Sequence, residues 1–218
     1  MVINMSLELY MKKYTTPLLL ALSIGTAAVT YPAMSATATL AEAGPAAAVD
    51  KKNPYKMIET VADITFKRFA NEQERIRENP NLLKNIVREE LMPYINYKYA
   101  AFKVIGNNFK KTNKKERAEF VPVFRDYLIT SYAQVFTLYK NQKVTFAPAK
   151  DFSNEKVVAV NTTVSEAGRA PIDISFRVRK DKKTKEWKAY DMVAEGISLL
   201  DSKQAELSSL IRQKGLAH

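Results

Sequence analysis

Two periods of apolar residues divide the chain between residues 53 and 215. In the first half, apolar side chains recur every three to four residues with Lys, Glu and Arg between them, a pattern typical of amphipathic helices. Helices are expected to begin at Asn53-Pro54 and at Asn79-Pro80, where a capping side chain precedes a proline. Another is expected at Asn113, because Glu116 three residues later completes a capping-box pattern.

The second half changes to a period of two. Its short runs, rich in Val, Ile, Thr and aromatic residues, are Lys143–Ala147, Lys156–Ser165, Pro171–Lys180 and Glu186–Glu195. Alternation of this kind predicts antiparallel strands with one apolar face. In the last run, Trp187, Tyr190, Met192 and Val193 cannot all face inward unless the strand contains a β-bulge.

A final helix is expected from Asp201-Ser202 to Gly215. Helices followed by strands predict an α+β fold in a single domain over residues 53–215. We expect the helices to pack on one face of a curved four-stranded antiparallel sheet, with an apolar cavity between the two layers.

The start of the chain is typical of a cleavable signal peptide over residues 1–38. Lys12 and Lys13 precede an uncharged run, and Ala36-Thr37-Ala38 provides a small-residue cleavage site. A membrane anchor is less favoured, because Thr, Ser, Gly and Pro dilute the apolar run below the roughly 20 residues that a span requires. Glu8 is unusual in such a segment and favours a start at Met11.

Cleavage after Ala43 is a second option. Residues 39–52 are expected to be a flexible leader, and residues 216–218 a short tail. In a bacterium, these features predict a periplasmic protein.

Charge restricts the choice of partner. The formal net charge is +11 and falls only to +10 when residues 1–38 are removed, since Lys12, Lys13 and Glu8 are lost. This excess favours an anionic partner. Nucleic acid is not expected, because the chain is exported and carries no nucleic-acid-binding module. Transient contact with an anionic membrane surface fits better.

Little in the sequence indicates catalysis. Cys is absent and the only histidine is the last residue, His218, which disfavours metal sites and Cys/His or Ser/His catalysis. No glycine-rich phosphate loop is present. The remaining acid/base candidates are carboxylates that mostly neighbour Lys or Arg: Glu89-Glu90, Asp173, Asp191 and Glu195. The sequence therefore favours a binding protein that is not an enzyme.

Several segments together carry a resemblance to one known family. In chain order they are Asn53-Pro54-Tyr55, Asn71-Glu72-Gln73, Ile76-Arg77, Asn79-Pro80, Glu90–Tyr94, Lys98-Tyr99-Ala100, Phe124–Leu128, Tyr132, Trp187–Ser198, Lys203-Gln204 and Arg212–Gly215. The sequence resembles the MlaC family, with Trp187–Ser198 as the most specific segment. The chain departs from the family in its early C-terminal end and its longer leader.

The resemblance implies a soluble periplasmic phospholipid carrier in the Mla lipid-transport system, which is also associated with toluene tolerance. The carrier would hold acyl tails in the cavity, with the headgroup outward. It would exchange lipid between an outer-membrane lipoprotein–porin complex and an inner-membrane ABC transporter with an MCE-domain subunit, and so maintain outer-membrane lipid asymmetry. Phospholipid would be cargo, and neither a cofactor nor a metal is implied.

The residues expected to line the cavity come from both halves of the chain. They are Val104, Phe124, Leu128, Tyr132 and Val135 from the helices, and Val160, Val164, Ile174 and Phe176 from the sheet. Tyr132 is the strongest single candidate. Two other readings stay open: a periplasmic interaction module whose basic face binds an acidic partner, and a hydrolase acting on an envelope lipid or glycan.

Overall fold

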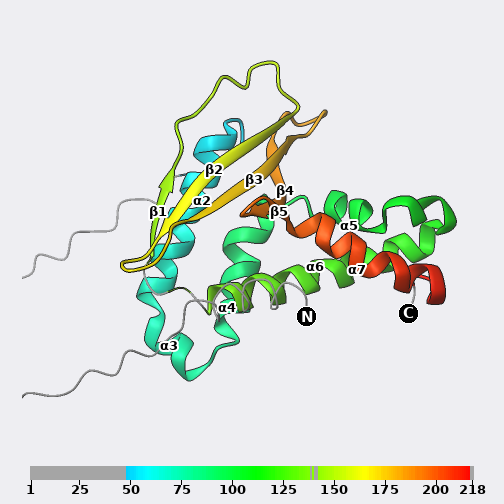
Figure 1. The fold of residues 1–218 in the computed structure, drawn as a ribbon, viewed down its shortest axis with the longest axis horizontal. Coiled ribbons are helices and arrows are strands. Elements are labelled where there is room, and N and C mark those ends of the chain that lie inside the picture. The colour runs from blue at the N-terminus through cyan, green and yellow to red at the C-terminus, as the bar shows by residue number, and fades with distance from the viewer. Residues whose placement is uncertain (1–47, 138, 140–141, 217–218) are drawn as a thin grey trace, which may run out of the picture. The chain divides into compact units, whose positions relative to one another are not determined.

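The computed structural model describes residues 48–137, 139 and 142–216 (Figure 1). The predicted signal peptide and most of the predicted leader lie outside these residues. The helical segments are α2 (Pro54–Asn71), α3 (Gln73–Glu78), α4 (Leu82–Ile86), the π-helical η1 (Val87–Leu91), the 3-10 turn η2 (Met92–Tyr94), α5 (Tyr97–Ile105), the 3-10 segment η3 (Gly106–Lys111), α6 (Lys114–Phe136) and α7 (Leu199–Lys214). The strands are β1 (Lys143–Phe146), β2 (Val157–Ser165), β3 (Ile172–Lys180), β4 (Trp187–Ala194) and β5 (Ile197–Ser198). The predicted α+β class with an antiparallel sheet is confirmed.

Two of the predicted helix starts are confirmed by their caps. The Asn53 side chain accepts hydrogen bonds from the backbone N–H groups of Tyr55 and Lys56 at the start of α2. At the start of α6, Asn113 and Glu116 form the complete capping box, with each side chain accepting from the other residue's backbone N–H. Both starts therefore follow from local side-chain chemistry.

The start predicted at Asn79-Pro80 is wrong, because α4 begins at Leu82. Asn79 has an extended backbone and its N–H donates to the carbonyl of Arg75, so this residue ends α3. Its side chain accepts from the N–H of Asn81 within the turn that follows.

The last helix also begins earlier than predicted, at Leu199. Ser198 is its N-cap, since its hydroxyl accepts a hydrogen bond from the N–H of Asp201 at 3.0 Å. Asp201 and Ser202 thus lie inside the first turn, where a carboxylate interacts favourably with the helix dipole. Gly215 ends α7, as predicted.

The sheet has five strands in the order β1-β2-β3-β4-β5, so the predicted number of four is wrong. The additional strand is β5, which pairs with the end of β4. The two-residue turn between them, Glu195-Gly196, has positive φ at both positions, which suits a tight antiparallel hairpin. Glu rarely adopts this conformation, so a turn at Glu195 could not be expected from its residue type.

The sequence left the register of β4 open, and the structure has a β-bulge in this strand at Tyr190. Arg177 of β3 pairs with Asp191, whereas the next residue, Val178, pairs with Ala189. Tyr190 is therefore the extra residue, and the sheet alternation changes phase around it.

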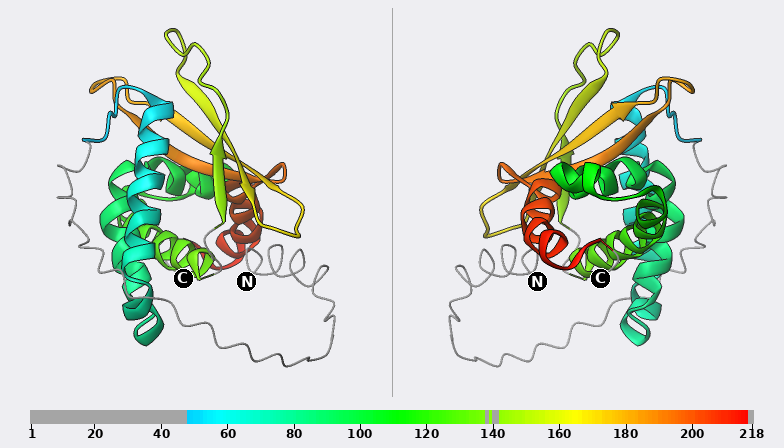
Figure 2. Two further views of the ribbon diagram at one scale, coloured as in Figure 1. Left: turned by 90° about the vertical axis from the view of Figure 1, so that its left-hand side faces the viewer. Right: turned by 90° about the vertical axis from the view of Figure 1, so that its right-hand side faces the viewer.

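One face of the sheet, here called the inner face, packs against α2. In Figure 2, α2 (cyan) lies beside the strands and is inclined to them. The buried core between them consists of Met57, Ile58 and Val61 from α2 and Val158, Val160, Val178 and Trp187 from the sheet. Complete burial of such side chains contributes roughly 1.5–3 kcal/mol each.

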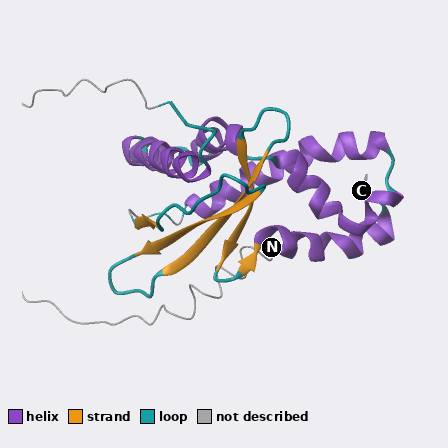
Figure 3. Cartoon of the chain, turned by 90° about the horizontal axis from the view of Figure 1, so that it is seen from above, coloured by secondary structure: helices purple, strands orange, loops and turns teal. Residues whose placement is uncertain are grey.

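The remaining helices form two further cores. One joins α2, α4, η1, η2 and α6 around Phe69, Ile86 and Ile129. The other joins α5, α6 and α7 around Ala101, Phe124 and Leu200. Figure 3 shows the helices of the latter core extending away from the strands.

Gly106, at the junction of α5 and η3, has a left-handed backbone conformation and lies against the end of the Gln204 side chain. Its φ is +54°, and an added Cβ would lie 1.8 Å from Nε2 of Gln204 on α7. We expect Gly106→Ala to lower the free energy of unfolding by about 1–3 kcal/mol, measured by urea denaturation. Gly106→Ala combined with Gln204→Ala should recover only the steric part, because the backbone strain persists. Equal stability of Gly106→Ala and wild type would contradict this account.

Candidate functional site

The inner face of the sheet is packed at one end and partly exposed at the other. Val158, Val160 and Val178 are buried beneath α2. Ile174 and Phe176 follow on the same face, because Phe176 pairs directly with Val160 and side chains alternate between faces along a strand. Both side chains are only partly buried. An apolar surface therefore continues beyond the area that α2 covers.

A second partly exposed apolar surface lies on α6. Leu128, Tyr132 and Val135 recur at helical spacing on this helix, and each is only partly buried. Leu128 packs against both of the helical cores, and Tyr132 against the one that contains Phe69.

The structure divides the nine residues predicted to line a cavity into two groups. Val104, Phe124 and Val160 are fully buried core side chains. The partly exposed side chains are Leu128, Tyr132, Val135, Val164, Ile174 and Phe176. Of these, Val135, Val164 and Ile174 belong to none of the three packed cores. Core packing therefore does not explain why these three positions carry apolar side chains.

Tyr132 combines partial exposure with a strongly apolar environment. Burial raises the pKa of its phenol well above the usual range, and the Asp191 carboxylate and Tyr127 raise it further. A tyrosine whose side chain is partly exposed while its phenol is desolvated is expected at the boundary of an internal space.

The phase change at Tyr190 adds residues to this surface that the sequence did not assign. Met192 pairs with Phe176 and Ala194 pairs with Ile174, so both lie on the inner face and both are partly buried. The apolar residues of this strand, which cannot all face inward without a bulge, were the signal available in the sequence. The position of the bulge was needed to place these side chains.

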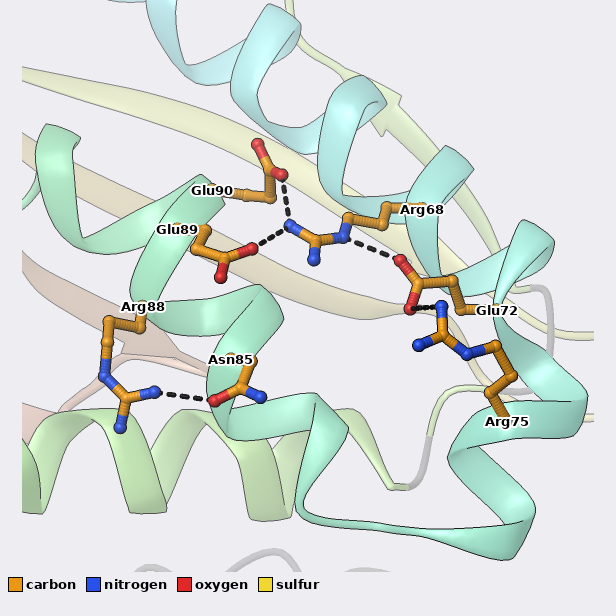
Figure 4. A network of polar contacts seen from close by, with 7 residues as sticks. All are labelled: Arg68, Glu72, Arg75, Asn85, Arg88, Glu89 and Glu90. Atoms are coloured by element: carbon orange, nitrogen blue, oxygen red, sulfur yellow. Dashed lines mark hydrogen bonds and ion pairs between the residues drawn. The ribbon is translucent and has the colours of Figure 1, made fainter.

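Glu89 and Glu90, the first acid/base candidates, both form ion pairs with Arg68 (Figure 4). This α2 guanidinium bonds Glu72 at 2.8 Å, and its Nη1 lies 2.6 Å from Glu89 and 2.5 Å from Glu90, which are both on η1. The pKa of Arg68 is raised, above all by its hydrogen bond to Glu72. The network joins η1 to α2 and leaves Glu89 and Glu90 paired with a cation.

Asp191 is likewise held by hydrogen bonds. Its buried carboxylate accepts from Ser198 Oγ at 2.8 Å, from the Leu200 N–H at 3.0 Å and from Arg177 at 3.1 Å. Asp191 thereby fixes the start of α7 against β4. Asp173 and Glu195 are the remaining candidates. The Glu195 carboxylate accepts a hydrogen bond from the backbone N–H of Asp173.

We expect Asp191→Asn to lower the free energy of unfolding by about 1–3 kcal/mol. The three partners of this carboxylate all donate hydrogen bonds, and the amide NH2 group of Asn cannot accept them. Chemical denaturation measures this change. Asp201→Asn is the matched control, since its carboxylate is exposed and lies 3.8 Å from the same arginine. Equal stability losses in the two variants would contradict the buried role of Asp191.

Within the residues that the structure describes, no group of His, Asp and Glu side chains could hold a metal ion. In the same part of the chain, none of the helices is long and apolar enough to cross a membrane.

Comparison with known proteins identifies the family. A sequence model described as MlaC protein matches residues 59–218. The chain is 34% identical over 170 residues to the Intermembrane phospholipid transport system binding protein MlaC of Haemophilus influenzae, covering 78% of this chain and 79% of that protein. The chain belongs to the MlaC family, and the resemblance seen in its sequence is confirmed.

The fold has a relative among solved structures. The phospholipid-binding protein of Ralstonia solanacearum, solved in complex with a phospholipid, superposes with a TM-score of 0.66. Its sequence is 20% identical, and the match covers 75% of this chain and 89% of that chain.

Proposed function

We propose that this protein is a periplasmic phospholipid carrier that holds acyl tails between the inner face of the sheet and α6. The observation that carries the proposal is the pair of partly exposed apolar surfaces. One consists of Ile174 and Phe176 on β3, and the other of Leu128, Tyr132 and Val135 on α6. The Haemophilus influenzae relative, named as a phospholipid transport binding protein, supports it. So does the phospholipid bound by the Ralstonia solanacearum protein of the same fold.

Burial of the tails supplies the affinity. Each methylene removed from water contributes roughly 0.8 kcal/mol, so two tails with about thirty methylenes gain on the order of 24 kcal/mol. A bilayer offers the tails nearly the same gain. The carrier therefore needs only rough parity with the membrane, and no reacting group takes part.

The carrier would work between two membranes. Its partners would be an outer-membrane lipoprotein–porin complex and an inner-membrane ABC transporter with an MCE-domain subunit, and the shuttle would maintain outer-membrane lipid asymmetry. The signal peptide of residues 1–38 would deliver it to the periplasm, with residues 39–52 as a leader. These partners, this location and the role in lipid asymmetry are proposed in addition to membership of the MlaC family.

Organic extraction of the purified protein, followed by mass spectrometry, tests the proposal. We expect about one to two phospholipids for each chain, as a single tail-binding interior would hold. A protein that carries no lipid and takes none from liposomes would overturn the carrier function. It would favour the interaction module instead, whereas turnover of an envelope lipid or glycan would favour a hydrolase.

A further inference from the structure

A dense group of cations surrounds η3 and the start of α6. Six cations and two carboxylates lie between residues 103 and 119: Lys103, Lys110, Lys111, Lys114, Lys115 and Arg117, with Glu116 and Glu119. We call this segment the η3 surface. The helices that carry it extend away from the strands (Figures 1 and 3).

The two carboxylates leave most of these cations unneutralised. Glu116 is the capping-box residue and accepts from the Asn113 N–H at 2.7 Å. Glu119 lies 3.9 Å from Lys115. No ion pair among the described residues involves Lys110, Lys111 or Lys114, and all three side chains are exposed.

Helix stability does not explain the lysines. Lys114 and Lys115 are the first two residues of α6. The helix dipole makes this end positive, so cations are unfavourable there. A cluster that opposes the local preference of its helix is a candidate for binding.

An exposed aromatic ring lies within the cluster. Phe109 of η3 is 37% exposed. Arg117 Nη1 donates to the carbonyls of Phe109 at 2.9 Å and Thr112 at 2.6 Å, and its guanidinium lies 4.3 Å from the Phe109 ring. The Phe102 ring packs edge-on against Phe109 at 5.4 Å. The ring is therefore held in place while part of it faces water.

We propose that the η3 surface binds the anionic surface of a phospholipid bilayer, with Phe109 inserted among the headgroups. Lysines contribute flexible, strongly hydrated point charges without the fixed geometry of a guanidinium. Lys is depleted in protein–protein interfaces, where Arg is enriched. The η3 surface has five lysines and one arginine, and the arginine already donates to carbonyls of the same segment. This composition fits a fluid anionic surface better than a protein partner. The proposal builds on the carrier function and supplies its contact with a membrane.

Vesicle co-sedimentation tests this contact. Wild type is expected to bind vesicles of phosphatidylglycerol and phosphatidylcholine in equal parts, and to bind phosphatidylcholine vesicles far more weakly. Lys110→Glu combined with Lys111→Glu should reduce partitioning to the anionic vesicles by on the order of fivefold or more for each lysine. Phe109→Ser should also weaken binding, while the remaining affinity keeps its dependence on salt.

The β3–β4 hairpin provides the matched control. Lys182 and Lys183 are exposed lysines in this turn, and replacing both by Glu changes the net charge by the same amount. This variant should bind the vesicles nearly as well as wild type. Equal losses in the two double variants would overturn the proposal, because net charge alone would then explain binding.

Absence of wild-type binding to the anionic vesicles would also overturn it and would favour an acidic protein as the partner. The lipid content of each variant, measured after organic extraction, separates this proposal from the carrier function. We expect the η3 variants to retain their lipid.

Discussion

Leu128→Asp is expected to abolish lipid retention, whereas Leu128→Met should retain lipid at the wild-type level. Leu128 is partly exposed on the face of α6 that also carries Tyr132. A carboxylate at this position would face acyl tails without a hydrogen-bonding partner, at a cost of several kcal/mol. The measurement is phospholipid per chain after organic extraction, quantified by mass spectrometry.

Folding must be separated from binding, because Leu128 also packs against two cores. Val135→Asp provides that separation, since Val135 lies in none of the packed cores. Far-UV circular dichroism and thermal unfolding should show this second variant to be folded, yet depleted of lipid. If both variants fold and still co-purify with lipid, the assignment of α6 to the tail-binding surface is wrong.

Trp187→Ala is expected to cause the largest loss of stability, about 3–5 kcal/mol, because a large core side chain leaves a cavity. Trp187 is fully buried, with Phe152 packed edge-on at 6.1 Å and the Lys180 ammonium 4.9 Å from its ring. The denaturation midpoint in urea measures the loss, provided that the slope of the transition stays constant.

Two controls refine this prediction. Trp187→Phe should cost much less, since it keeps most of the volume and removes an indole N–H that has no hydrogen-bond partner among the described residues. Val157→Ala, at a 44% exposed position, should change stability by less than about 0.5 kcal/mol. A Trp187→Ala protein as stable as Val157→Ala would contradict the central place of Trp187 in the core.

The elements that could be predicted from the sequence are those with local causes. The capping residues Asn53 and Asn113 act on N–H groups two or three positions away, and strand alternation depends only on which face is apolar. Asn79 misled because the same side chain that caps a helix also closes a turn. The β5 strand was missed because Glu195 adopts a backbone conformation that its residue type disfavours.

The candidate site was harder to predict, because lining and core residues look alike in a sequence. Val160 and Ile174 both occupy inner-face positions, but only Val160 lies beneath α2. Where α2 stops covering the sheet depends on tertiary packing. Met192 depended in addition on the exact position of the bulge.

The sheet order β1-β2-β3-β4-β5 leaves β1 and β5 at the two edges. These edges affect how readily the lipid-free protein, with its apolar surface accessible, would aggregate. Its two edge strands are short, with four residues in β1 and two in β5. Long free edges recruit strands from other chains and start aggregation, which short edges discourage. Beyond β5, the outer side of β4 is also occupied, because the Trp187 N–H donates to the Lys51 carbonyl and the Ala189 carbonyl accepts from the Asn96 N–H. At this edge the chain therefore offers a second copy little free backbone with which to extend the sheet. We expect the lipid-free protein to stay monodisperse at concentrations where a long-edged sheet would precipitate.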